Sequence, residues 1–324
     1  MSNFKKISKN IQQITIANPQ KNFTVDWLNI NGAGKAEIEY LRKKYNFKLA
    51  HLRASSAKAN SQRPMVARES DYMFMILHFP VPAGDSANGV ISAEIEFFIG
   101  HGWLVTLPSR PIEPLDNFFN LCKKDGASLL SYELESSAIL LYEILNKLLG
   151  YSFLILDNNS LAIARAEQAV LGADQKKSAG LIMGLRHNLI NLRKIMQNHK
   201  NILKRLMAME SAVVPAEHLK KYYGELIDQT KKIWEILENQ REMVEVLFDS
   251  FESQANYQLG KTMKTLTIFY VIFSSLSLVA AIFSMKVDKG MPFISLPNGF
   301  LIILAIMGLV GLFMILLFKR KKWL

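Results

Sequence analysis

One helical face near the end of the chain carries small and polar side chains through an otherwise apolar stretch. In steps of three or four residues this polar stripe comprises Asp249, Gly260, Met263, Thr267, Tyr270, Ser274, Ser277 and Ser284, and Ser253, Asn256 and Ala281 fall on the same face. A polar face inside a membrane must meet protein or water, because polar groups left unsatisfied in lipid are costly. The stripe therefore either lines a path for ions or packs against another helix.

The stripe lies mainly on the first of two long apolar runs. A charge-free run extends from Thr265 to Met285, and a longer one extends from Gly290 to Phe318. Each run exceeds the ~20 residues needed to cross a ~30 Å hydrocarbon core. The connection between them is only a few residues long. We therefore predict transmembrane helices over 265–285 and 294–318, joined by an external loop over 286–293.

Cations flank this hairpin on one side. Lys319, Arg320, Lys321 and Lys322 follow the second run and begin a basic tail over 319–324, while Lys261 and Lys264 precede the first run. Cytoplasmic segments next to membrane helices carry an excess of Lys and Arg. The N-terminal cations are not followed by the apolar segment of a signal peptide. The sequence thus predicts a multi-pass protein of the inner (plasma) membrane with both termini in the cytoplasm.

Composition excludes several other classes of protein. The net charge is +11 at pH 7, but Lys and Arg are spread along the chain without a basic patch interleaved with aromatic residues. We therefore expect attraction to anionic lipid and no binding of nucleic acid. The single cysteine, Cys122, fits a reducing compartment and a small buried side chain. The sequence has no nucleotide-binding glycine motif, nucleophile elbow or close His/Cys cluster, so no enzyme is expected.

The first third of the chain alternates apolar and polar residues with the period of strands. Residues 1–20 are rich in Asn, Gln, Lys and Ser and predict a mobile tail. Strands are predicted over 24–31, 71–79, 90–99 and 103–107, and an amphipathic helix over 35–45. Pro80 and Pro82 are expected to end the second of these strands. Residues 21–114 therefore predict an α/β sheet domain.

Helical patterns replace the strand signals beyond Pro114. They cover 115–124, 129–170 and 178–209, so residues 115–214 form the helical part of the cytosolic domain. After Pro215 no proline occurs until Pro292, which predicts a stalk helix over 215–264 that continues into the membrane to about 283. Its heptad positions include Leu226 and Ile233, with Gln240 as a polar interruption. Such a helix needs neighbours, either from other subunits or from its own domain.

This order of segments resembles the CorA-type two-helix divalent cation transporters. The residues that carry the resemblance extend from about 20 to 324: Trp27 to Gly32, Gln62-Arg63-Pro64-Met65-Val66, Asp71-Tyr72-Met73-Phe74, the spacing of Met263, Leu266 and Ile268, Met291-Pro292, and the final Lys-Lys-Trp-Leu. The resemblance implies an α+β cytosolic domain with a long stalk helix and two transmembrane helices. It also implies a CorA-like funnel that is a homopentamer, in which five copies of the first membrane helix surround the path of Mg²⁺, Co²⁺, Ni²⁺ or Zn²⁺. It favours pore lining over simple packing for the polar stripe.

One departure from the family concerns selectivity. The family's signature at the outer end of the first span is Gly-Met-Asn, and the corresponding residues here are Ser284, Met285 and Lys286. The asparagine carbonyl accepts hydrogen bonds from ion-bound water, whereas a lysine ammonium only donates them. Five such lysines around one mouth would oppose a divalent cation, unless Lys286 points outward to Asp288 or to lipid headgroups. Two functions therefore stay open: a cation transporter, or a membrane-anchored regulatory or scaffold protein that has lost conduction.

The resemblance also implies a regulatory metal site. Glu225 corresponds to the family's intersubunit metal-sensing acid, Asp228 lies one turn further on, and Asp85 in a loop could supply the partner. Carboxylates from two subunits suit Mg²⁺, although acids on a helix surface are usually only solvated charge. We expect no cofactor other than a possible bound divalent metal, Mg or Zn.

Overall fold

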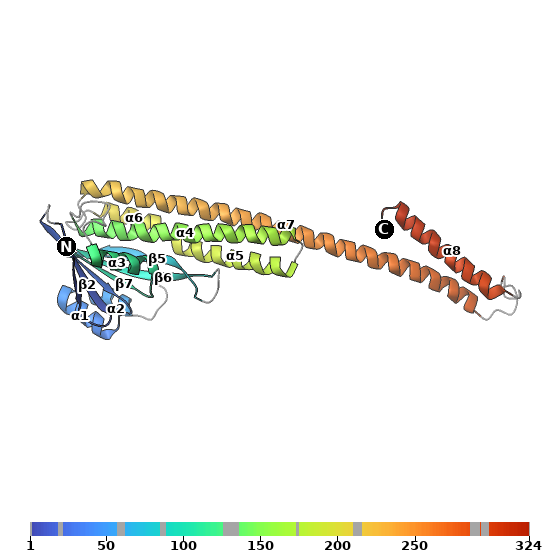
Figure 1. The fold of residues 1–324 in the computed structure, drawn as a ribbon, viewed down its shortest axis with the longest axis horizontal. Coiled ribbons are helices and arrows are strands. Elements are labelled where there is room, and N and C mark those ends of the chain that lie inside the picture. The colour runs from blue at the N-terminus through green and yellow to red at the C-terminus, as the bar shows by residue number, and fades with distance from the viewer. Residues whose placement is uncertain are drawn as a thin grey trace. The chain divides into compact units, whose positions relative to one another are not determined.

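The computed structural model describes residues 2–18, 22–56, 62–84, 89–125, 136–172, 175–209, 216–285, 292 and 298–323. The chain divides into two compact units, Met1–Phe248 and Asp249–Leu324. The first unit combines a sheet with helices, and the second contains the end of one long helix and a further apolar helix (Figure 1).

The first unit is built on a seven-stranded sheet in its described residues, with the strand order β1-β2-β3-β7-β6-β5-β4. The strands are β1 (Ser2–Lys6), β2 (Ile11–Asn18), β3 (Phe23–Ile30), β4 (Met65–Arg68), β5 (Tyr72–Pro82), β6 (Val90–Gly100) and β7 (Trp103–Pro108). Neighbouring strands are antiparallel except β3 and β7, which are parallel. The predicted strands are all present, and two more precede them.

Strands β1 and β2 correct the prediction of a mobile tail over 1–20. Ile14 and Ile16 on β2 are fully buried and lie opposite Trp27 and Val25 of β3. The prediction was wrong because it followed the high content of Asn and Gln. The period-two spacing of these isoleucines, which predicts a half-buried strand, was the better signal.

Strand β5 also runs further than predicted. Pro80 and Pro82 pair with Ser92 and Val90 of β6 and do not end the strand. Strand β4 pairs with β5 only from Met73 to Ile76. Beyond Ile76, β5 pairs with β6 on one side, and on the other side no described strand pairs with it. Because proline has no N–H to donate, it is tolerated on such an edge.

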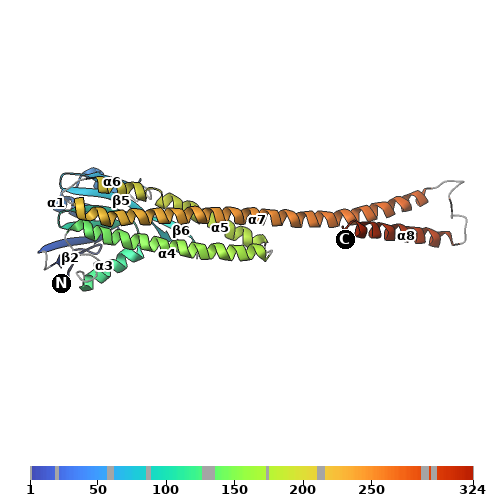
Figure 2. The same ribbon diagram turned by 90° about the horizontal axis from the view of Figure 1, so that it is seen from above.

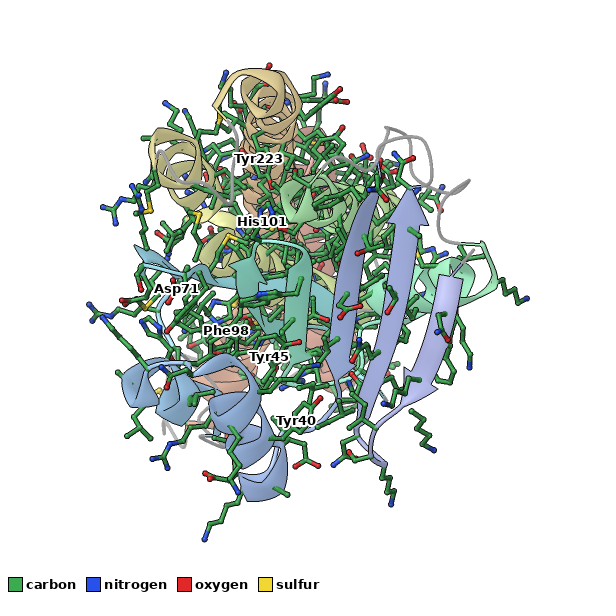
Figure 3. The ribbon with its side chains drawn as sticks, turned by 90° about the vertical axis from the view of Figure 1, so that its left-hand side faces the viewer. Tyr40, Tyr45, Asp71, Phe98, His101 and Tyr223 are labelled. Atoms are coloured by element: carbon green, nitrogen blue, oxygen red, sulfur yellow. The ribbon has the colours of Figure 1, made fainter. Side chains whose placement is uncertain are left out.

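Helices cover both faces of the sheet. On one face, α1 (Lys35–Tyr45) and α2 (Leu49–Ser56) close a core that contains Leu28 and Phe98. Tyr45 and Phe98 lie in the layer between the sheet and these helices (Figure 3). On the other face, Trp27 packs against Phe118 and Phe119 of α3 (Glu113–Asp125). Burial on both faces explains the almost continuous apolar sequence of β5 and β6.

The remaining helices of the first unit pack lengthwise. They are α4 (Ser137–Leu171), α5 (Gln175–Met196), α6 (His199–Ala208) and the first part of α7 (Ala216–Ser284), and α4, α5 and α7 lie side by side in both views (Figures 1 and 2). The helical pattern predicted over 178–209 is divided at 197–198, where Asn198 occupies the N-cap of α6. The predicted stalk agrees with α7 to within a residue at its start and end.

Polar contacts hold α7 against α4. The Tyr223 hydroxyl donates to the carbonyl of Ala138 at 2.8 Å. Further along, the Gln240 amide donates to the carbonyl of Leu156 at 2.8 Å and accepts from Asn159 at 2.9 Å. The neighbours of this part of the stalk therefore come from its own domain, and Gln240 is a buried, hydrogen-bonded member of the contact.

We expect Gln240→Leu to lower the free energy of unfolding by about 2 kcal/mol, because it leaves the buried Asn159 amide without its partner. Thermal unfolding of the detergent-solubilised full chain measures the change. Gln168→Leu, an exposed position on α4, is the control and should alter stability by no more than ~0.5 kcal/mol. Equal effects of the two substitutions would contradict this role of Gln240.

A buried histidine gives the first unit a dependence on pH. His199 is 1 % exposed, its ring lies against Phe79, and neither ring nitrogen has a hydrogen-bond partner among the described residues. Burial, followed by the charge of nearby His78, lowers the pKa of His199 from 6.5 to about 4. Between these values the unfolded chain binds a proton that the folded chain does not, so stability falls as the pH falls from 6.5 to 4.

His199→Phe is expected to remove about 2 kcal/mol of the loss of stability between pH 7 and pH 5. The measurement compares melting temperatures at pH 7 and pH 5 for the parent and the variant. His187→Phe, at an exposed position on α5, should keep the parent's pH dependence. Parallel pH profiles for the parent and His199→Phe would show that His199 does not carry the effect.

Candidate functional site

Three helices in the described part of the chain are long and apolar enough to cross a membrane. They are Ser137–Leu171, Tyr222–Ser284 and Gly299–Arg320, the last being α8. The apolar window of the first is 67 % buried within the structure, whereas those of the other two are 6 % and 0 % buried. The first is therefore a core helix, α4. The second and third leave apolar surface uncovered, as helices in lipid do. The end of the second overlaps the predicted span 265–285, and the third overlaps the predicted span 294–318.

Helix α8 covers one face of α7 within the second unit. Ile268 is 5 % exposed, and Ile272, Leu276, Val279 and Phe283 on the same face are half-buried. A Cβ on Gly311 of α8 would lie 3.9 Å from the Leu276 side chain, which is ordinary contact. At the other end, the Lys264 ammonium donates to the carbonyl of Lys322 at 2.9 Å. The covered face is the apolar face opposite the polar stripe.

The polar stripe is left uncovered by α8. All eight of its residues are exposed in the protomer: Asp249, Gly260, Met263, Thr267, Tyr270, Ser274, Ser277 and Ser284. Exposed fractions of 63 % for Met263 and 73 % for Tyr270 show that even the large members have no cover. Packing of the stripe against α8 is thereby excluded. What remains is contact with water or with another subunit.

Hydroxyl groups along α7 differ in their hydrogen bonds, and Thr267 of the polar stripe is among those that are bonded. Ser275, on the side of α8, donates to the carbonyl of Val271 at 2.8 Å, and Thr267 donates to the carbonyl of Met263 at 2.8 Å. Such bonds to the preceding turn satisfy a hydroxyl without a neighbour. Within the described residues, neither Ser274 nor Ser277 has a hydrogen-bond partner. These two hydroxyls therefore need water or a second subunit.

The two ends of the stripe carry different chemistry. Asp249 is exposed and, in the described part of the chain, forms no ion pair. At the other end, α7 terminates at Ser284 and Met285 is 62 % exposed. Lys286 lies outside the described residues, so its predicted place in the signature stays a prediction. A cation on this path would meet a carboxylate at one end and the signature positions at the other.

The predicted regulatory acids are placed together in one protomer. Glu225 and Asp228 both line a surface depression of ≈ 790 Å³ beside α4. The Tyr142 hydroxyl donates to Glu225 at 2.8 Å. Lys231 lies 2.6 Å from Asp228 and, through this hydrogen bond, lowers the pKa of the Asp228 carboxyl. The contact with Tyr142 could not be seen in the sequence, because the two residues belong to distant segments.

A complete metal site is not formed within the described residues of one protomer. No group of three His, Cys, Asp or Glu side chains able to hold a metal occurs among them. Asp85, the predicted third acid, lies outside the described residues. Glu225 and Asp228 therefore supply at most two of the carboxylates that a Mg²⁺ site takes from protein.

Comparison with known proteins gives consistent matches along the chain. Residues 23–320 match the family described as CorA-like Mg²⁺ transporter protein. The cobalt/magnesium transport protein CorA of Thermotoga maritima is 24 % identical over 301 residues, which cover 93 % of this chain and 84 % of that protein. The protein of the same description from Methanocaldococcus jannaschii is 21 % identical over 304 residues, covering 94 % and 93 % of the two chains.

Solved structures share the fold. The complete structure of the CorA magnesium transporter from Methanocaldococcus jannaschii superposes with a TM-score of 0.82 at 19 % identity, covering 100 % of this chain and 98 % of that one. The full-length CmaX protein superposes with a TM-score of 0.70 at 17 % identity, covering 95 % and 91 %. The shared fold comprises the soluble α/β domain, the long helix and the two C-terminal helices.

Proposed function

Because the chain belongs to the CorA-like Mg²⁺ transporter family, we propose that it passes divalent metal cations through a homopentameric pore. The cations are Mg²⁺, Co²⁺, Ni²⁺ or Zn²⁺, and they move down their electrochemical gradient. The protein lies in the inner (plasma) membrane with both termini in the cytoplasm. The family is one of transporters and not of enzymes, so the chemistry proposed is binding and passage without bond formation.

The observation that carries this proposal is the uncovered polar stripe on α7. Helix α8 occupies the opposite, apolar face, and the stripe presents the Ser274 and Ser277 hydroxyls without partners in the described residues. Five copies of α7 with this face inward would surround a polar path. The same arrangement would leave α8, whose apolar window is 0 % buried, toward the lipid. In this arrangement the polar face of α7 meets water and the apolar surface of α8 meets lipid.

The second candidate function is a membrane-anchored regulatory or scaffold protein that no longer conducts. Lys286 favours it, because an ammonium cannot accept hydrogen bonds from ion-bound water at the position of the family's asparagine. The two functions differ in a flux assay with the full chain in liposomes. Uptake by the parent supports transport, whereas uptake by Lys286→Asn alone would establish that the parent has lost conduction.

The number of subunits tests the pore directly. Native mass spectrometry of the detergent-solubilised full chain should show five copies. Five α7 helices can enclose a path with one face each, whereas two copies cannot enclose one. Any stoichiometry other than five would remove the assignment of the stripe to a pore.

We also propose that a regulatory divalent metal binds between subunits, with Glu225 and Asp228 of one subunit and Asp85 of the next as ligands. Mg²⁺ should then raise the melting temperature of the parent, because a ligand that binds only the folded assembly stabilises it. Asp85→Asn should reduce that rise by more than about half. Asp157→Asn, which removes an exposed acid of α4, should leave it unchanged. Equal rises in all three proteins would rule these ligands out.

A further inference from the structure

A cavity of ≈ 720 Å³ lies within the first unit, and its described lining includes no residue of the polar stripe and neither Glu225 nor Asp228. Three of its lining residues are cations that come from separate segments. Arg63 precedes β4, Arg110 follows β7, and Lys194 belongs to α5. The fold therefore gathers three positive charges around one hollow between the edge of the sheet and the helices.

These three cations have no ion-pair partner among the residues that the structure describes. In the described part of the chain, none of Arg63, Arg110 and Lys194 forms an ion pair. The Nε of Arg110 is buried and has no hydrogen-bond partner there. A buried donor of a charged group left without a partner costs free energy. A ligand that accepts hydrogen bonds and carries negative charge would remove that cost.

Glu94, the acidic residue in the described lining of the cavity, already has hydrogen-bond partners. Glu94 lies 3.1 Å from the ring of His78 and accepts a hydrogen bond from the backbone N–H of Gln62 at 3.0 Å. It therefore has partners of its own on the wall of the cavity. In the described lining the three cations therefore outnumber this single carboxylate.

The neutral part of the lining also suits an anion. Asn198 lines the cavity and is the N-cap of α6, and its side chain makes no capping hydrogen bond. Helix N-termini attract anions through their free N–H groups and the helix dipole. Ile91 and Ile195 add an apolar wall. The volume is within the range of about 300–1,000 Å³ that is usual for small-molecule sites.

We propose that this cavity binds a phosphate-bearing small molecule of about mononucleotide size, with Arg63, Arg110 and Lys194 holding the phosphate groups. Arginine suits phosphate because its planar fork donates two parallel hydrogen bonds to it. The apolar wall of Ile91 and Ile195 takes the uncharged part of the molecule. The site gives the cytosolic unit a ligand other than the transported cation.

Isothermal titration calorimetry on the detergent-solubilised full chain tests this proposal, without added divalent cations. The probes are ATP, pyrophosphate and inorganic phosphate, and adenosine is the uncharged control. ATP and pyrophosphate should bind, adenosine should not, and affinity should fall as salt is raised. Tighter binding of ATP than of pyrophosphate identifies a nucleotide, and equal binding identifies the phosphate groups alone.

Matched variants locate the bound anion. Arg110→Gln and Lys194→Gln should each weaken binding at least about tenfold, as expected for a charged hydrogen bond. Lys204→Gln removes an exposed cation of α6 outside the cavity and should change the affinity less than about twofold. Lys194 is itself exposed, so its substitution tests the site without threatening the fold.

The proposal is overturned if no charged probe binds at concentrations up to about 5 mM. It is also overturned if both cavity variants bind within about threefold of the parent, or if Lys204→Gln weakens binding as much as they do. Binding is measured without a membrane gradient. The result is therefore independent of whether the chain conducts cations.

Discussion

A positively charged methanethiosulfonate reagent forms a mixed disulfide with the thiol of Ser274→Cys and releases methanesulfinate. This modification is expected to lower the initial rate of cation flux at least about tenfold, because it places bulk and positive charge in the path. Ser274 belongs to the uncovered stripe, and its hydroxyl has no partner within the described residues. A thiol at this position would face water and react. The measurement is divalent flux into liposomes before and after treatment with the reagent.

The next residue provides a matched control. Ser275 is half-buried on the side of α8, and its hydroxyl is bonded to the carbonyl of Val271. Ser275→Cys should react much more slowly. The parent should not respond at all, because Cys122 is fully buried and burial raises the pKa of its thiol to about 12. Equal labelling of the two variants, or labelled Ser274→Cys with unchanged flux, would contradict a path along the stripe.

Lys286→Asn is expected to raise divalent flux about twenty- to thirtyfold at physiological salt. Two unit charges ~8 Å apart in water interact by about 0.5 kcal/mol, so five lysines oppose a divalent cation by about 5 kcal/mol before screening. A Debye length of about 8 Å reduces this to about 2 kcal/mol. The gain should be larger at low salt and smaller at high salt.

The orientation of Lys286 decides the size of this effect. If its side chain points outward to Asp288 or to lipid headgroups, Lys286→Asn should change flux less than about twofold. Lys289→Asn, in the same predicted external loop, is the control for a general loss of charge. A salt-independent effect shared by both variants would rule out a ring of ammonium groups at the mouth.

Elements with a strong local period could be predicted from the sequence. The helix over 35–45 agrees with α1, and the long helix beginning near 216 agrees with α7, because apolar periodicity and the positions of proline determine both. The two membrane spans could be predicted because charge-free apolar runs of this length must be buried either in lipid or in a protein core. Strand β2 was missed because its isoleucines alternate among Asn and Gln, so that composition concealed the pattern.

Contacts between distant segments could not be predicted. The pairings of Tyr142 with Glu225 and of Asn159 with Gln240 join α4 to α7, and no local pattern indicates either of them. The same holds for the cavity that gathers Arg63, Arg110 and Lys194. Each of these cations alone resembles ordinary surface charge, and only the fold brings them to one hollow.

The candidate site was predicted in part by residue pattern and in part by family resemblance. Helical spacing identified the stripe, and the structure shows that α8 covers the opposite face. The roles of Lys286 and Asp85 came from resemblance alone. Both residues lie outside the described part of the chain, so their roles stay predictions.

The most direct test is the initial rate of divalent uptake by liposomes that contain the parent chain, under an imposed inside-negative potential. For a divalent cation, 100 mV contributes about 4.6 kcal/mol to the driving force. We predict that Mg²⁺, Co²⁺, Ni²⁺ or Zn²⁺ enters faster than into protein-free liposomes and that the rate rises as the potential becomes more negative. Rates equal to those of protein-free liposomes for all four ions at every potential would contradict the account.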